Sequence, residues 1–163
     1  MKRPIVVAFT LLFAGCLVGR IVASQEPAKE SAANTGSALS LVRTLNTVQA
    51  TFFLDAHSYV SREVMLGDKG LKQQAPKSDW ARQLNFSSDE ILPGWRLDFA
   101  LAPNGYRLVL VGPKDVFITD ESAAIYRATL GQTRPAASAL KSARSFPGAV
   151  PFDEFQASKK SDN

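Results

Sequence analysis

The sequence has little of the chemistry that most enzyme and metal sites use. Its 163 residues contain one Cys and one His. A single Cys excludes an internal disulfide, and together with one His it is too few for a structural zinc site. We predict no catalytic residues, no cofactor, no metal ligands and no enzymatic activity. The one His, His57, follows a predicted helix, where the negative end of the helix dipole favours a partly charged imidazole over a catalytic base or ligand.

The chain also has almost no net charge outside its first residues. Nineteen Lys and Arg face fifteen Asp and Glu, which gives +4. Three of the basic residues (Lys2, Arg3 and Arg20) fall within residues 1–24, and no acidic residue does. The remaining chain carries sixteen basic and fifteen acidic residues. Proteins that bind nucleic acids usually carry an excess of basic residues, and this part of the chain does not, so we predict no nucleic-acid partner.

Residues 1–24 have the order of an export segment. A basic start precedes the apolar stretch Pro4–Gly19, and the small residues Val22, Ala23 and Ser24 follow. This is the pattern of a secretory signal peptide, and we predict cleavage between Ser24 and Gln25. The expected location is the periplasm or cell envelope of a bacterium.

Two other interpretations of this segment stay open. Residues 4–24 are nearly long enough for an uncleaved inner-membrane anchor, with Arg20 reaching the interface. The run Leu12-Phe13-Ala14-Gly15-Cys16 approximates a lipobox, in which Cys16 is lipidated. Phe13 stands where Leu is usual, and apolar residues continue past Cys16, so we favour an ordinary apolar role for this Cys.

The rest of the chain divides into three parts. Residues 25–37 are polar and small, which predicts a linker or a frayed entry into the following helix. Residues 38–128 contain the periodic apolar patterns of a folded domain, about 90 residues long and near the small end for an independent core. Residues 129–163 are rich in Ala, Ser, Pro and Gly, which predicts a flexible tail. Within that tail, residues 151–155 are either a docking peptide or the cap of a hydrophobic patch.

The folded part is predicted to be α+β. Leu41, Leu45, Val48 and Phe52 recur at helical spacing, which predicts an amphipathic helix over about residues 38–56. Alternating apolar residues then predict strands at 95–101, 106–111, 116–119 and 123–128, joined by short turns. Such short connections favour an antiparallel meander. The expected fold is one N-terminal amphipathic helix packed on a meander of about four strands.

Three segments resemble a known family. Residues 40–51, SLVRTLNTVQAT, are similar to the S-L-R-T-I-N-T-A-Q-x-T-Y helix of pilin-like and pseudopilin-like proteins. Residues 94–99, GWRLDF, resemble the G-Y-x-F-x-F strand of that family, and 105–108, GYRL, the strand after it. Residues 116–127, VFITDESAAIYR, resemble its closing F-F-T-D-E-S-G-V-I-R motif. The resemblance covers residues 38–128 but not the prepilin N-terminal motif, because Phe13 stands where that motif has Glu.

The resemblance implies a pilin-like head in a type IV pilus or type II secretion pseudopilus, as a structural or accessory subunit. The implied partners are other pilin-like subunits or the pilus and secretion machinery. An alternative is a periplasmic binding module for a small molecule or peptide, with a pocket near Trp80, Trp95, Tyr106 and His57, although core packing is the favoured role of these aromatic residues. A hydrolase is disfavoured, because the neighbouring acids at 89–90 and 120–121 point to opposite faces of a strand.

Overall fold

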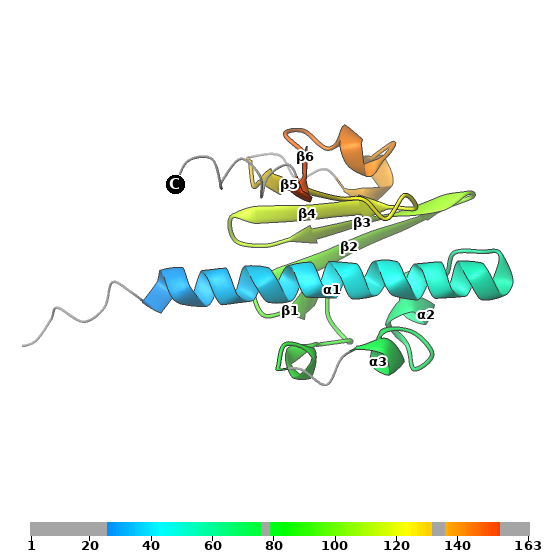
Figure 1. The fold of residues 1–163 in the computed structure, drawn as a ribbon, viewed down its shortest axis with the longest axis horizontal. Helices are drawn as coiled ribbons and strands as arrows, with labels where there is room; N and C mark the ends of the chain where they lie inside the picture. Colours follow the sequence, from blue (N-terminus) through cyan, green and yellow to red (C-terminus); the bar gives the residue numbers. More distant parts are fainter. Residues whose placement is uncertain (1–25, 76–78, 132–135, 154–163) are drawn as a thin grey trace, which may run out of the picture.

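A computed structural model describes residues 26–75, 79–131 and 136–153 (Figure 1). One long helix, α1 (Glu26–Ala56), crosses an antiparallel sheet of six strands. The chain is therefore a mixed α+β protein in which the sheet lies between α1 and a C-terminal segment. The predicted leader, its cleavage site and Cys16 lie outside the described residues.

Helix α1 begins earlier than the sequence suggests. It starts at Glu26 and runs through Asn34 and Gly36, where the sequence predicts a linker or a frayed entry into the helix over residues 25–37. From Asn34 onward, contacts with residues distant in the chain stabilise the helix despite the low helix propensity of this stretch. Asn34 donates a hydrogen bond from Nδ2 to the carbonyl of Pro93 at 3.0 Å, and Ala38, one turn later, is fully buried.

The sheet is a meander in strict chain order, β1 to β6. Its strands are β1 (Glu90–Leu92), β2 (Trp95–Ala102), β3 (Gly105–Val111), β4 (Asp115–Asp120), β5 (Ile125–Thr129) and β6 (Val150–Pro151). All neighbouring strands are antiparallel. The tight turn from β1 to β2 uses Gly94 at φ +77°, a conformation that glycine adopts without strain.

The predicted fold class is wrong in its sheet and in its tail. β2 to β5 lie where the sequence predicts four strands, but β1 precedes them and β6 follows them. β1 has three residues and β6 two, which is too short for an alternating pattern to be recognised. The tail predicted to be flexible supplies β6 and two turns of 3₁₀ helix, η2 (Ala137–Ala139) and η3 (Ala143–Ser145).

One face of the sheet packs on α1. Leu41, Leu45 and Val48 of the helix are fully buried against Leu108 and Phe117 of the sheet. Shorter elements close the sides of this core: α2 (Arg62–Leu66), α3 (Leu71–Gln74) and the 3₁₀ turn η1 (Ala81–Gln83). Trp95 is 1% exposed and stacks on Phe117, with ring centroids 5.5 Å apart.

The other face of the sheet packs on the C-terminal segment, residues 136–149. A second buried cluster joins Val109, Val116 and Ile118 of the strands to Leu140 and Phe146 of this segment. Figure 1 shows the segment, in orange, on the opposite side of the sheet from α1. β3 and β4 are therefore buried on both faces, and the protein has three layers.

Two carboxylates and one guanidinium fix the C-terminal segment in place. Asp98 accepts the N–H of Ala137 at 2.8 Å, and the buried Asp120 accepts the N–H of Ala143 at 2.7 Å. Arg107 donates to the carbonyl of Lys141 at 2.7 Å. The two carboxylates satisfy N–H groups at the starts of η2 and η3, which helical turns leave unpaired, and Arg107 binds the stretch between them. They explain why an Ala- and Ser-rich segment is ordered.

Candidate functional site

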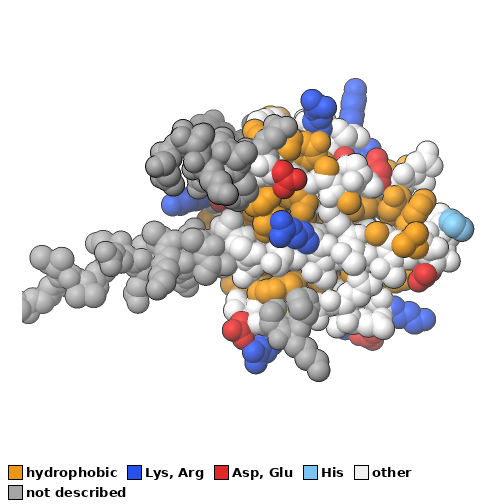
Figure 2. Space-filling view, in the orientation of Figure 1, with side chains coloured by type: hydrophobic (Ala, Val, Ile, Leu, Met, Phe, Trp, Pro, Cys, Tyr) orange, Lys and Arg blue, Asp and Glu red, His pale blue; other side chains and the backbone are white. Residues whose placement is uncertain are grey.

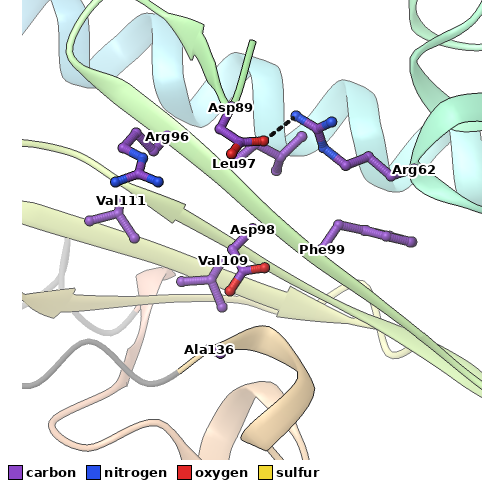
Figure 3. A pocket seen from close by; sticks show the side chains of 9 residues that line it. All are labelled: Arg62, Asp89, Arg96, Leu97, Asp98, Phe99, Val109, Val111 and Ala136. Carbon is purple, nitrogen blue, oxygen red and sulfur yellow. Dashed lines mark ion pairs between the residues drawn. The ribbon is translucent and has the colours of Figure 1, made fainter.

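A groove lies along the outer edge of β2 (Figure 3). We call it the edge groove; its volume is about 290 Å³. The residues that line it come from α2, the segment before β1, strands β2 and β3, and the start of the C-terminal segment. They are Arg62, Asp89, Arg96, Leu97, Asp98, Phe99, Val109, Val111 and Ala136.

The edge groove runs over the rim of the sheet rather than across one face. Leu97 and Phe99 direct their side chains into the core on the α1 side. Asp98 and Val109 belong to the opposite face, since Asp98 binds the C-terminal segment and Val109 joins its core. Residues of both faces line one groove only where the edge strand itself is accessible. The groove therefore exposes part of the β2 backbone.

An ion pair forms the α2 wall of the edge groove. Arg62 and Asp89 point toward each other above β2, with Nη2 and Oδ1 3.2 Å apart (Figure 3). Nη2 of Arg62 also donates to the carbonyl of Ser88 at 3.2 Å, while its Nε is buried without a hydrogen-bond partner. Arg96 is exposed, and no described residue forms an ion pair with it.

A second hollow continues past the far end of β2. We call it the apolar hollow; it is about 640 Å³ and lies between the end of α1 and the β2–β3 turn. Phe53, Tyr59 and Leu101 supply its apolar surface. Figure 2 shows hydrophobic side chains gathered at this end of the molecule, beside the single His. Leu101 is 50% exposed, and Leu54, which follows Phe53 at the end of α1, is 76% exposed.

A buried glutamine shapes the apolar hollow. Gln49 on α1 is fully buried; its Nε2 donates to the carbonyl of Val60 and its Oε1 accepts the N–H of Val60, both at 3.0 Å. This pair of bonds holds the chain that returns from α1, so that Tyr59 stacks on Phe53 with centroids 4.8 Å apart. The hollow is thus preformed by the fold.

A buried polar cluster ties α1 to the sheet nearby. Asn46 donates from Nδ2 to Oγ1 of Thr119 at 3.0 Å and to the carbonyl of Ala123 at 3.2 Å. The hydroxyl of Tyr106 donates to Oδ1 of Asn46 at 3.0 Å. Burial raises the pKa of Tyr106 far above its usual value, and the nearby Tyr59, Asp120 and Glu121 add to the increase. Each polar group of Asn46 has a partner, so the cluster is structural.

We expect the Tyr106 hydroxyl to make stability fall at alkaline pH. Its pKa is higher in the folded than in the unfolded chain, so above about pH 10 the unfolded state loses its proton first and unfolding becomes more favourable. Tyr106→Phe should lower the free energy of unfolding at pH 8 by about 1 kcal/mol, because it removes one hydrogen bond. Relative to wild type, it should also lose less stability between pH 8 and pH 11.

Urea denaturation at the two pH values measures both effects. Tyr126→Phe is the matched control, since Tyr126 is half-buried outside this cluster; it should retain the wild-type loss of stability. An alkaline loss that is unchanged in Tyr106→Phe would contradict the assignment.

The structure does not assemble the predicted aromatic pocket. Trp95 and Tyr106 are 1% and 2% exposed and belong to the core. Trp80 is half-buried against the same core. His57 lies at the rim of the apolar hollow, at φ +52°, and is exposed. These four residues therefore do not line a common cavity.

The acidic residues considered for hydrolysis have structural partners. Asp89 pairs with Arg62, and Glu90 accepts the N–H of Gly94 at 2.9 Å. Asp120 is buried and also accepts the hydroxyl of Ser122 at 2.6 Å. Over the residues that the structure describes, no three His, Cys, Asp or Glu side chains gather as a metal site would require. Nor is any helix in these ranges long and apolar enough to cross a bilayer.

Sequence reasoning missed the edge groove, and comparisons with known proteins do not assign it. No protein-family model matches the chain, and no match was found among curated proteins or solved structures. The groove is formed by Arg62 and Asp89, which no motif links, and by the short length of β1. The only local signal was the amphipathic β2 strand, which does not reveal an open edge.

Proposed function

We propose that the protein is a non-enzymatic subunit of the bacterial cell envelope, exported and built like a pilin or pseudopilin head. It would serve as a structural or accessory component of a type IV pilus-like or type II secretion-like apparatus. Its partners would be other pilin-like subunits or that machinery, and residues 4–24 would attach it to the inner membrane only if they are retained. The resemblance of residues 38–128 to that family motivates the proposal.

The geometry of α1 is the observation that supports it best. The helix begins at Glu26, directly after the apolar leader, and has 31 residues, about 46 Å at 1.5 Å per residue. Its N-terminal part extends beyond the sheet in Figure 1, while its second half packs on the sheet. A helix that links an apolar segment to a compact head suits an anchored or assembled subunit better than a freely diffusing enzyme.

The uncovered face of α1 offers a direct test. Arg43, Thr47 and Ala50 follow one another along the exposed side of the helix. A photo-crosslinking amino acid at Thr47 or Ala50 of the full chain, expressed in its host, should give adducts with pilin-like or secretion-apparatus subunits in the envelope fraction. The same amino acid at Lys69, exposed in the turn between α2 and α3, should not.

Mass spectrometry of the intact protein from the envelope fractions shows whether residues 1–24 are cleaved, retained or lipidated. A membrane species that retains residues 4–24 indicates an anchor, and added diacylglycerol indicates lipidation of Cys16. A soluble species beginning at Gln25 indicates a cleaved signal peptide. A soluble monomer that forms no adduct from Thr47 or Ala50 would reject the proposed function.

A further inference from the structure

Beyond the end of β1, no strand among the described residues pairs with the outer edge of β2. The N–H of Leu97 donates to the carbonyl of Asp89 at 2.8 Å, toward the outside of the sheet. Successive residues of an antiparallel strand alternate in direction, so the N–H and C=O groups of Phe99 and Leu101 face the same edge. The register of β1 ends opposite Arg96. Within the described ranges, no strand reaches these groups.

We propose that an extended peptide segment of a partner protein binds along this edge as an additional β-strand. Unpaired N–H and C=O groups on an edge strand form a ready template for such pairing. The edge groove is where β2 is accessible, and the apolar hollow lies directly beyond it. The inference goes beyond the proposed envelope role and does not rest on it.

Arg96 determines the chemistry at one end of the occupant. It lies in the edge groove, exposed and without an ion-pair partner among the described residues. Arg62, by contrast, is already paired with Asp89. A carboxylate is the group that a guanidinium recognises best, so the peptide should carry Glu or Asp, or its own C-terminus, at this end.

The apolar hollow determines the chemistry at the other end. Leu101 on β2 is half-exposed beside Phe53 and Tyr59, and the hollow offers these apolar surfaces to a side chain of the occupant. Leu101 lies five residues after Arg96, about 17 Å along a strand. Because five is odd, the two side chains face opposite sides of the sheet. Because β1 occupies the position opposite Arg96, the occupant pairs only along residues 98–102, and its carboxylate reaches Arg96 from the end of the peptide next to β1.

Amide hydrogen exchange of the full-length protein, followed by NMR, tests the edge. In the free protein, the amides of Phe99 and Leu101 should exchange faster than those of Asp98 and Ala100, which face β3. Addition of the acetylated, amidated peptide Glu-Thr-Val-Thr-Val-Leu should slow exchange at Phe99 and Leu101. The same peptide with N-methyl groups on alternate residues should not, because it lacks the backbone donors that pair with the edge.

Two pairs of variants separate backbone pairing from side-chain contacts. Leu101→Pro removes an edge N–H and should weaken peptide binding about tenfold, whereas Leu101→Ala, which keeps the N–H, should weaken it about threefold. Arg96→Glu should weaken binding about fivefold. Lys69→Glu, which makes the same charge change outside the groove, should leave binding unchanged.

Three results would overturn the proposal. The first is slow exchange of Phe99 and Leu101 in the free monomer, which would show that the edge is already covered. The second is no added protection at these amides with millimolar peptide. The third is protection that rises with protein concentration alone, together with dimers in sedimentation analysis, which would make a second copy of this chain the occupant.

Discussion

A chain that ends after Leu130 should lose at least about 4 kcal/mol of unfolding free energy. The truncation removes η2, η3 and β6 and exposes the second face of the sheet, including Val116 and Ile118. Burial of Leu140 and Phe146 alone contributes about 2 kcal/mol each. Natural domains are stable by only about 5–15 kcal/mol, so this loss removes much of the total.

Urea denaturation and dye binding measure this effect. The truncated chain should unfold at lower urea and bind a hydrophobic dye such as ANS in the absence of urea. The control is a chain that ends after Asp153, which retains every described residue and should behave like the full chain. Equal stability of both truncations would show that residues 136–151 do not form a third layer of the fold.

Trp95→Ala should lower the free energy of unfolding by about 4 kcal/mol, the usual range for removing a large buried aromatic side chain. Trp95 is fully enclosed, stacks on Phe117, and fills the space left by Gly112. Trp80→Ala is the matched control, because Trp80 is only half-buried and should cost clearly less. Chemical denaturation of both variants gives the comparison.

Gly112 provides an independent check on this packing. A Cβ at Gly112 would lie 2.7 Å from the Trp95 ring. Gly112→Ala should therefore destabilise the wild-type protein by about 1–3 kcal/mol through overpacking. In the Trp95→Ala background the same change should cost much less, since the ring is gone. Additive effects of the two substitutions would contradict the contact.

The sequence predicted those elements whose burial follows a regular spacing of apolar residues along the chain. The helical spacing of Leu41, Leu45 and Val48 and the alternation in β2 each report one buried face, and both elements occur in the structure. Residues of β3 and β4 also carried a second apolar row, Val109 with Val116 and Ile118. Such a row indicates that the second face of the sheet is buried by another segment. The tail that buries it showed no apolar periodicity, so the sequence did not identify this segment.

The tail could not be predicted because its order comes from distant partners. Ala137 and Ala143 are small, so they bury fully without a conspicuous hydrophobic pattern. Their N–H groups bind carboxylates 39 and 23 residues away in the chain. The helical start of α1 is similar, since Asn34 bonds to Pro93, 59 residues later. Propensity and composition carry no record of such contacts.

The edge groove was equally inaccessible to sequence reasoning. The edge of β2 is open because β1 pairs with only part of it. The extent of this pairing depends on the length of β1 rather than on any residue type. The Arg62–Asp89 pair joins α2 to the segment before β1, 27 positions apart, and neither residue belongs to a motif. Trp95 and Tyr106, for which core packing was favoured over a pocket, are buried in the core.

The three-layer arrangement has a consequence for the order of folding. The two faces of the sheet are covered by segments that flank it in sequence, α1 before it and residues 136–149 after it. While the chain emerges from N- to C-terminus, β3 and β4 can pair and dock on α1, but their second face stays exposed until residues 136–149 have emerged. If the protein is exported, these residues must be translocated before the fold closes. Chaperones that shield apolar surface would then act late in folding, on the face of the sheet opposite α1.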